Sequence, residues 1–179
     1  MSIDRGGSAA EERRNKESQL ASLYEGCYDS IARYAYARIG NRADAEDLAG
    51  EVFLKALESL KSYKERGVPM KAWLFRIAHN LVVDYLRKMT KRKTVSIDTA
   101  QIESSANPLT IAEKNIELDR VSKAMEQLTA GQRQVLSLRF FAGLTSKEAG
   151  HVMGKSDGAV REMQRAAIEK LRKLLAIDD

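Results

Sequence analysis

Cysteine and proline are scarce in this 179-residue chain, which has one cysteine, Cys27, and two prolines, Pro69 and Pro108. A single cysteine excludes a disulfide within the chain and a zinc site built from several cysteines, so we expect a reducing, cytoplasmic setting. No apolar run approaches the length of a bilayer span, and the polar first eighteen residues argue against a signal peptide. With few prolines and little β-type alternation, the sequence predicts an all-α protein.

The sequence also lacks a group of residues with the types and spacing of a catalytic site. The acidic cluster at residues 44 to 51 is accompanied by no nucleophile, metal-ligand set or paired histidine. The two lone histidines, His79 and His151, fit ordinary polar contacts better than ligands. We therefore expect no catalytic residue, no metal, no cofactor and no enzymatic activity.

Positive charge exceeds negative charge, with 30 Lys and Arg against 25 Asp and Glu and a formal net charge of +5. This excess favours a polyanionic partner, either nucleic acid or an acidic membrane surface. An apolar fraction of 44% with 31% charged residues is typical of a soluble globular protein. The length allows one mid-sized domain or two small ones.

A helix-turn-helix is predicted between residues 145 and 172. Thr145 and Glu148 have the spacing of a capping box that begins one short helix, and Gly154 ends it. Ser156 then caps a second, amphipathic helix. Two short helices joined by a glycine-containing turn are typical of DNA-binding proteins, in which the second helix enters the major groove.

Basic residues distinguish this hairpin from a purely structural one. Lys155 lies at the front of the second helix, where exposed N–H groups favour anions, and Arg161 and Arg165 lie one turn apart on its polar side. A structural helical hairpin remains the alternative reading, although it would not need these three side chains. We favour DNA binding.

The first half of the chain predicts three core-facing helices after a frayed tail at residues 1–15, which has glycine, serine and mixed charge without periodicity. Apolar residues follow helical spacing from Leu20 to Ala35, then along 44–60 and again along 70–89. The first half of the second helix carries four carboxylates. They are either stabilised there by the helix dipole, with no further role, or form an acidic docking surface for a basic partner. These are Asp44, Glu46, Asp47 and Glu51.

The third helix carries a polar edge that ends in a basic cluster at residues 87–93. An amide, Asn80, and an acid, Asp84, share this edge with Arg76, Arg87 and Lys88. A charge run is most often a solvated face. Here the mixture of residue types suits contacts with bases as well as phosphates.

Residues 93–107 lose helical periodicity and are predicted to be a flexible linker that ends in Asn-Pro. The chain then divides into two small helical domains, 16–92 and 108–179, the second containing the helix-turn-helix.

Three segments in this order resemble bacterial sigma-70 family transcription initiation factors of the extracytoplasmic-function (ECF) group. They are DAEDLAGEVFLKAL (44–57), AWLFRIAHNLVVDYLRK (72–88) and QLTAGQRQVLSLRFFAGLTSKEAGHVMGKSDGAVREMQRA (127–166). The chain departs from the family pattern at Gly50, Thr129, Met163 and the pair Ala149-Gly150. These departures concern promoter sequence and affinity rather than class.

The resemblance implies a division of labour. Residues 16–92 would recognise and help melt the minus-10 promoter element and dock on core RNA polymerase, and residues 108–179 would recognise the minus-35 element. The loop at 61–68 would take up a flipped base. The implied minus-35 residues are Lys155, Ser156, Asp157, Gly158, Arg161 and Arg165. The implied minus-10 residues are Tyr63, Arg76, Asn80, Asp84, Arg87 and Lys88, and the implied polymerase-docking residues are Asp44, Glu46, Asp47 and Glu51.

The alternative function is an autonomous helix-turn-helix transcriptional regulator, with the first half serving for dimerisation or sensing; it predicts specific duplex binding without polymerase. A nucleic-acid-processing enzyme ranks last. An anti-sigma factor is a further candidate partner.

Overall fold

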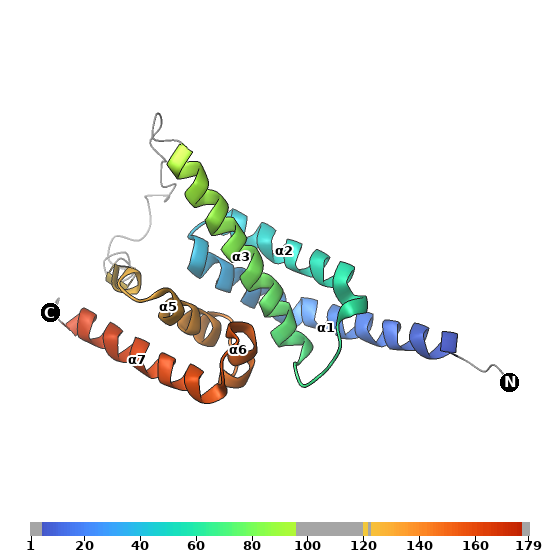
Figure 1. Cartoon of the computed structure of the whole chain (residues 1–179). Helices are drawn as coiled ribbons and strands as arrows, with labels where there is room; N and C mark the ends of the chain where they lie inside the picture. The colour runs from blue at the N-terminus through green and yellow to red at the C-terminus, as the bar shows by residue number, and fades with distance from the viewer. Residues whose placement is uncertain (1–4, 96–119, 122, 177–179) are drawn as a thin grey trace.

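The protein is described by a computed structural model that covers residues 5–95, 120–121 and 123–176, and within these ranges it is helical without a strand (Figure 1). The predicted all-α class is therefore confirmed. Only residues 93–95 of the predicted linker are described, and they continue the preceding helix; the remainder lies outside the described residues. The elements are α1 (Arg5–Ile39), α2 (Arg42–Ser59), η1 (Leu60–Ser62), α3 (Met70–Val95), α5 (Ala130–Leu136), η2 (Ser137–Phe141), α6 (Ser146–Met153) and α7 (Asp157–Ala176).

The prediction of a frayed tail at residues 1–15 is wrong from Arg5 onward, because α1 begins there. Two ion pairs one turn apart support this extension, Lys16 with Glu12 and Arg13 with Glu17, both at 2.7 Å. The extension also lies beside the end of α2, where it forms one wall of a groove. The glycines near the start of the chain masked this helical tendency in the sequence.

Helix boundaries in the second half follow the predicted caps. Thr145 and Glu148 form a complete capping box at the start of α6. Thr129 and Gln132 form another at the start of α5. Gly154 ends α6 in the left-handed conformation, with a φ of 65° that favours glycine.

Two helical groups build the molecule. Helices α1, α2 and α3 pack together over fully buried side chains that include Ile31, Tyr34, Val52 and Phe75. Helix α5, the π-helical turn η2, α6 and α7 form the second group around Val135, Leu138, Leu144 and Val160.

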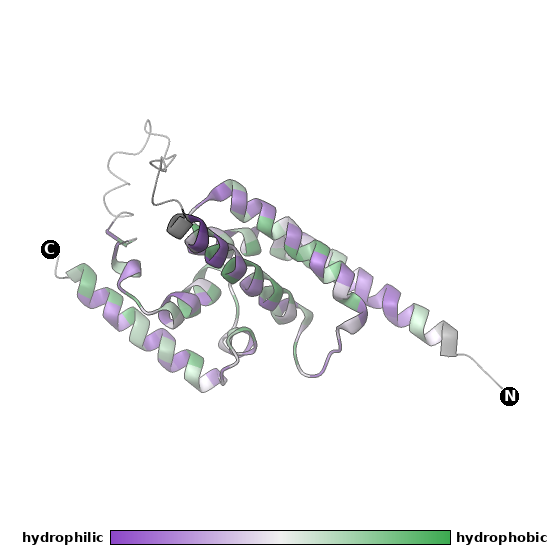
Figure 2. Ribbon diagram, turned by 45° about the horizontal axis from the view of Figure 1, so that its top comes forward, coloured by the Kyte–Doolittle hydropathy of each residue, from purple (hydrophilic) through white to green (hydrophobic). Residues whose placement is uncertain are grey.

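The two groups are packed against each other. Helix α6 lies against α3, and η2 lies against α1 (Figure 1). The buried residues of both groups belong to one continuous cluster. Hydrophobic and hydrophilic residues alternate along the helices (Figure 2), and the buried cluster takes its members from α3 and α7 among other elements. Within the described ranges, no helix is both long enough and apolar enough to cross a membrane.

Candidate nucleic-acid and polymerase interfaces

The second helix of the hairpin, α7, presents its basic side chains to solvent. The Arg161 and Arg165 side chains are 67% and 74% exposed. Each is held by an acid on the same helix: Asp157 lies 2.9 Å from Arg161, and Glu162 lies 3.1 Å from Arg165. These surface pairs leave the guanidinium groups accessible to a nucleic-acid backbone or a base edge.

The remaining residues predicted for the minus-35 element cluster at the start of α7. Lys155, Ser156 and Gly158 are exposed, and Asp157 is half-buried. The Ser156 hydroxyl accepts a hydrogen bond from the backbone N–H of Ala159 at 3.2 Å, as an N-cap does. The six predicted residues therefore lie in the turn before α7 and along its first half.

Sequence reasoning missed a concave surface of about 640 Å³ beside the two arginines. Arg139 reaches it from η2 and donates through Nε to Gln164 Oε1 at 2.8 Å and through Nη1 to the Leu144 carbonyl. Its rim is formed by Ser146 and Arg172. Arg172 shares the helical face of Arg161 and Arg165, so spacing could have found it. Nothing in the sequence pointed to Arg139, because its role depends on contacts between elements.

The polar edge of α3 is accessible over most of its predicted length. Arg76, Asn80, Arg87 and Lys88 are exposed. Asp84 is half-buried and accepts a hydrogen bond from Arg87 Nη2 at 2.9 Å.

Asn80 and Asp84 line a groove of about 460 Å³ between α2 and α3. Lys55 and Ser59 form its opposite wall, and Ile77 and Leu81 contribute apolar surface. Glu58 lines the groove as well, so an amide, two carboxylates and an ammonium group meet at one hollow with apolar walls, which can hold a planar, polar-edged group such as a base.

Tyr63 does not belong to this accessible set. Its side chain is 4% exposed, its hydroxyl donates to the Val68 carbonyl at 3.0 Å, and its ring centroid lies 4.9 Å from that of Trp73. The expectation that Tyr63 contacts a base is therefore corrected for this conformation. The Tyr63 hydrogen bond to Val68 joins the two ends of the loop at 61–68. Packing of the aromatic ring on Trp73 is more favourable than exposing the ring to solvent, so Tyr63 stays buried.

The four acids at the start of α2 differ in their surroundings. Asp44 is half-buried and accepts a hydrogen bond from Tyr85, which raises the pKa of that phenol. Glu46 pairs with Arg42 at 3.0 Å. Asp47 and Glu51 are exposed on the outer face, and Glu51 lies 3.5 Å from Lys55. Asp44 therefore joins α2 to α3, and the free acidic surface lies further along the helix.

Two leucines continue the outer face of α2. Leu54 is 63% exposed and Leu57 is 55% exposed. The expectation that Leu57 belongs to the core stripe is wrong, because the core side of α2 is filled by Val52, Phe53 and Ala56. An acidic helix face that continues into two exposed leucines is typical of a protein-binding surface.

In the part of the chain that the structure describes, no group of three or more His, Cys, Asp or Glu side chains is arranged to hold a metal ion.

Two protein families match the two helical groups. Sigma-70 region 2 matches residues 23–92, and Sigma-70, region 4 matches residues 124–173. BldN, an ECF RNA polymerase sigma factor of Streptomyces coelicolor, is 34% identical over 160 residues, covering 87% of this chain and 60% of BldN. SigD, an ECF RNA polymerase sigma factor of Mycobacterium tuberculosis, is 30% identical over 169 residues, covering 91% of this chain and 80% of SigD.

Solved structures agree with these relationships. The sigma factor RpoE in complex with the anti-sigma factor NepR from Bartonella quintana has a TM-score of 0.67 and 25% identity, covering 90% of this chain and 99% of that chain. CnrH in complex with the cytosolic domain of CnrY has a TM-score of 0.66 and 25% identity, covering 96% of each chain. With both regions in order along one chain and relatives of at least 30% identity, this protein belongs to the ECF group of sigma-70 family RNA polymerase sigma factors.

Proposed function

We propose that this protein binds core RNA polymerase in the cytoplasm and directs it to promoters, without itself catalysing a reaction. The chain spans 60% of BldN and 80% of SigD, so the proposal concerns the two regions that it contains. Its main support is that one chain presents an exposed basic helix in region 4 and an exposed polar edge in region 2, where two DNA elements are to be recognised.

Recognition of the minus-35 element is proposed for the start of α7. Arg161 and Arg165 would contact bases or phosphates in the major groove, with Lys155, Ser156, Asp157 and Gly158 close to the backbone.

Recognition and opening of the minus-10 element are proposed for the α3 edge. Asn80 and Asp84 would contact an unstacked base at the groove between α2 and α3. Arg76, Arg87 and Lys88 would neutralise phosphates on either side. Tyr63 would take part only after the loop at 61–68 has opened, because it is buried.

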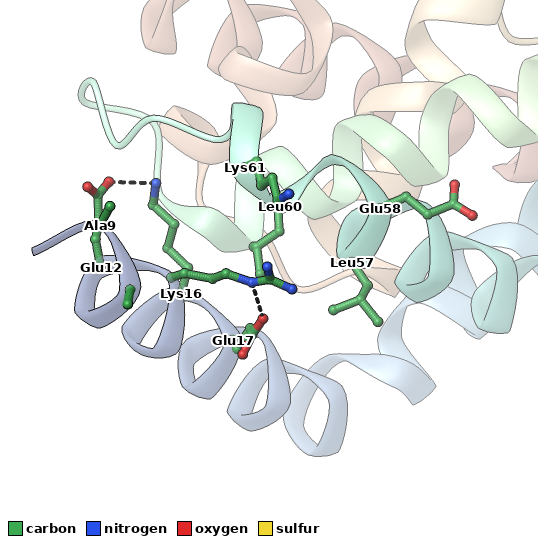
Figure 3. Close-up of a pocket in the computed structure, with 10 residues that line it drawn as sticks. Ala9, Glu12, Lys16, Glu17, Leu57, Glu58, Leu60 and Lys61 are labelled. Atoms are coloured by element: carbon green, nitrogen blue, oxygen red, sulfur yellow. Dashed lines mark hydrogen bonds and ion pairs between the residues drawn. The ribbon is translucent and has the colours of Figure 1, made fainter. Parts of the chain in front are cut away.

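Docking on polymerase is proposed for the outer face of α2. Asp47 and Glu51 supply the charge that steers a basic partner, and Leu54 and Leu57 supply apolar area. The first turns of α1 lie beside this face and enclose a groove of about 700 Å³ with Leu57, Leu60 and Glu58 (Figure 3). Residues 5–22 precede the region 2 match and would widen the docking surface.

An anti-sigma factor is a further proposed partner, because RpoE was solved in complex with one. A purified candidate protein should abolish transcription that depends on this chain, and excess chain should restore it.

Run-off transcription tests the main proposal. Core polymerase with a promoter library should give discrete transcripts only when this protein is added. If it binds a specific duplex tightly without polymerase and yields no transcript with it, the protein is an autonomous regulator instead.

A further inference from the structure

A hydrogen bond between Asp44 and Tyr85 connects α2 to α3. The Tyr85 hydroxyl donates to the Asp44 carboxylate at 2.5 Å, and both side chains are half-buried. The bond joins the first turn of α2 to the second half of α3. Asp44 therefore differs from Asp47 and Glu51, which are exposed on the outer face of the same helix.

The start of α2 leaves the Asp44 carboxylate free for this contact. The backbone N–H of Asp44 donates to Asn41 Oδ1 at 3.0 Å, so Asn41 supplies the helix cap. Arg42, the nearest basic residue along the chain, pairs with Glu46 at 3.0 Å. The side chain of Asp44 is thus turned toward α3 and serves neither the cap nor that ion pair.

The phenol is the donor in this bond and remains protonated. The hydrogen bond to Asp44, burial and the charge of Asp44 raise the pKa of Tyr85, and the charge of Arg92 opposes them. Because the net shift is upward from the ordinary value of a tyrosine, the hydroxyl keeps its proton near neutral pH. Arg92 belongs to the basic cluster at 87–93, so the acidic start of α2 and the basic end of α3 approach each other here.

The bond adds direction to an interface that is otherwise apolar. Helix α2 packs against α3, and its buried side chains include the small residues Ala45, Ala49 and Ala56. Apolar burial is non-directional, whereas a hydrogen bond to a carboxylate restricts both the distance and the angle between its partners. The Asp44–Tyr85 bond therefore limits how far α3 can shift along or turn against α2.

Two faces that carry the proposed function lie beside this bond. Asp47, on the outer face of α2, follows Asp44 by one helical turn. Asp84, which lines the groove between α2 and α3, immediately precedes Tyr85. A change in the bond would alter the position of one face relative to the other.

We propose that Asp44 and Tyr85 are positioning residues, which hold the minus-10 edge of α3 in place relative to α2 when α2 is docked on polymerase. Asp44 acts through Tyr85 and is not itself a polymerase contact. The inference rests on the proposed function, and it separates one of the four acids of α2 from the docking surface.

Loss of the bond should affect promoter opening more than docking. Unstacking a base costs a few kcal/mol, so its capture depends on the position of Asn80 and Asp84 at the groove. Docking uses the outer face of α2, which keeps its side chains when the bond is lost. Opening should therefore slow while polymerase affinity stays unchanged.

Three variants separate the hydrogen bond from the charge. Asp44→Asn keeps an oxygen that can accept from Tyr85 but removes the charge, and Asp44→Ala removes both. Tyr85→Phe removes the donor and keeps the ring, so it keeps the test valid if Asp44→Ala does not fold. Titration with labelled core polymerase measures docking. A fluorescent base analogue in the minus-10 element of a promoter selected from the library measures the rate of opening.

Asp44→Ala and Tyr85→Phe should each slow opening roughly 3- to 10-fold, the effect of losing one hydrogen bond. The double variant should be no slower than the slower single variant, because both changes remove the same contact. Asp44→Asn should restore opening nearly to the original rate. Polymerase affinity should stay unchanged in all of these variants.

Two matched controls accompany these variants. Tyr36→Phe removes a hydroxyl from a tyrosine of α1 that is 53% exposed, and it should open promoters at the original rate. Asp47→Asn removes an exposed carboxylate from the outer face of α2 and should weaken polymerase binding.

Several outcomes would overturn the inference. If Asp44→Asn weakens polymerase binding as much as Asp47→Asn does, Asp44 is a docking charge. If Tyr85→Phe lowers polymerase affinity and opening alike, the bond serves only the fold. Normal opening by all contact variants would overturn the positioning role alone, whereas an original protein that opens no promoter with core polymerase would overturn the proposed function.

Discussion

The guanidinium group of Arg161 lies 2.9 Å from the carboxylate of Asp157, one turn earlier on α7. This pair orients Arg161 along the exposed face of the helix while leaving its side chain 67% exposed. Asp157 fixes the orientation of Arg161 in the free protein, and DNA would replace Asp157 as the partner of Arg161.

Arg161→Ala should weaken binding to a minus-35 duplex by about 1 to 3 kcal/mol and relax preference at one base pair, provided that the guanidinium contacts guanine. Competition binding of the polymerase complex against a panel of single-base variants measures both effects. Equal weakening on every sequence, with a smaller salt dependence, would identify Arg161 as a phosphate contact instead. Lys173→Ala is the control for a general loss of charge, since Lys173 is exposed near the end of α7, away from the proposed contacts with DNA and polymerase.

Charge reversal of Asp47 and Glu51 to lysine should weaken association with core polymerase, because both carboxylates face outward beside Leu54 and Leu57. Helical content should hardly change, because exposed charges contribute little to folding. Titration with labelled polymerase and circular dichroism give the two readings. Loss of both binding and helicity would mean that the acids serve the fold.

Gly150→Ala should destabilise the protein by about 1 to 3 kcal/mol. A Cβ atom at this position would lie 2.5 Å from the backbone oxygen of Lys155, so the turn between α6 and α7 would have to shift. Gly50→Ala is the matched control: it also lies within a helix, and its Cβ would meet no atom within 4 Å. That change should stabilise by about 0.5 to 1 kcal/mol. Urea denaturation of both variants decides the comparison.

The folded protein should lose stability as the pH falls below about 6.5, the ordinary pKa of histidine. Burial, followed by the charge of Arg38, lowers the pKa of His79 in the folded protein. The unfolded chain therefore binds the proton more readily than the folded one, so the stabilisation is complete above the ordinary pKa. It is lost as the pH falls toward the lowered value.

Urea denaturation between pH 8 and pH 5.5 measures this dependence. His79→Asn keeps an acceptor oxygen near the position of Nδ1 and cannot titrate. Its stability should change less across the range, and a pH response as large as that of the original protein would assign the titration to another group.

The free protein should bind a duplex with both elements hardly better than a duplex with the minus-35 element alone. Tyr63 is buried, and a closed duplex offers region 2 no unpaired base to take up. Fluorescence anisotropy at near-physiological salt compares the two duplexes, with and without core polymerase. Much tighter binding of the longer duplex by the protein alone would favour an autonomous regulator.

Local sequence signals determined most of the helices. The capping boxes at Thr129 and Thr145 and the glycine at position 154 act within a few residues, so they were readable without a structure. The basic start of α7 and the polar edge of α3 also follow from helical spacing alone, because residues three or four apart share a face.

Tertiary packing decided which side chains are buried and which residues are partners, and the spacing of residues along the chain does not contain this information. Tyr63 is buried and Leu57 is exposed because neighbouring elements fill or leave the space beside them. The first turns of α1 lie beside the end of α2 across a groove, a neighbourhood that spacing along the chain does not express. His79 and Gln134 are 55 residues apart in sequence, and only the packing of region 4 on region 2 makes them partners. Burial and pairing are properties of the space around a residue, whereas periodicity and capping are properties of the chain itself.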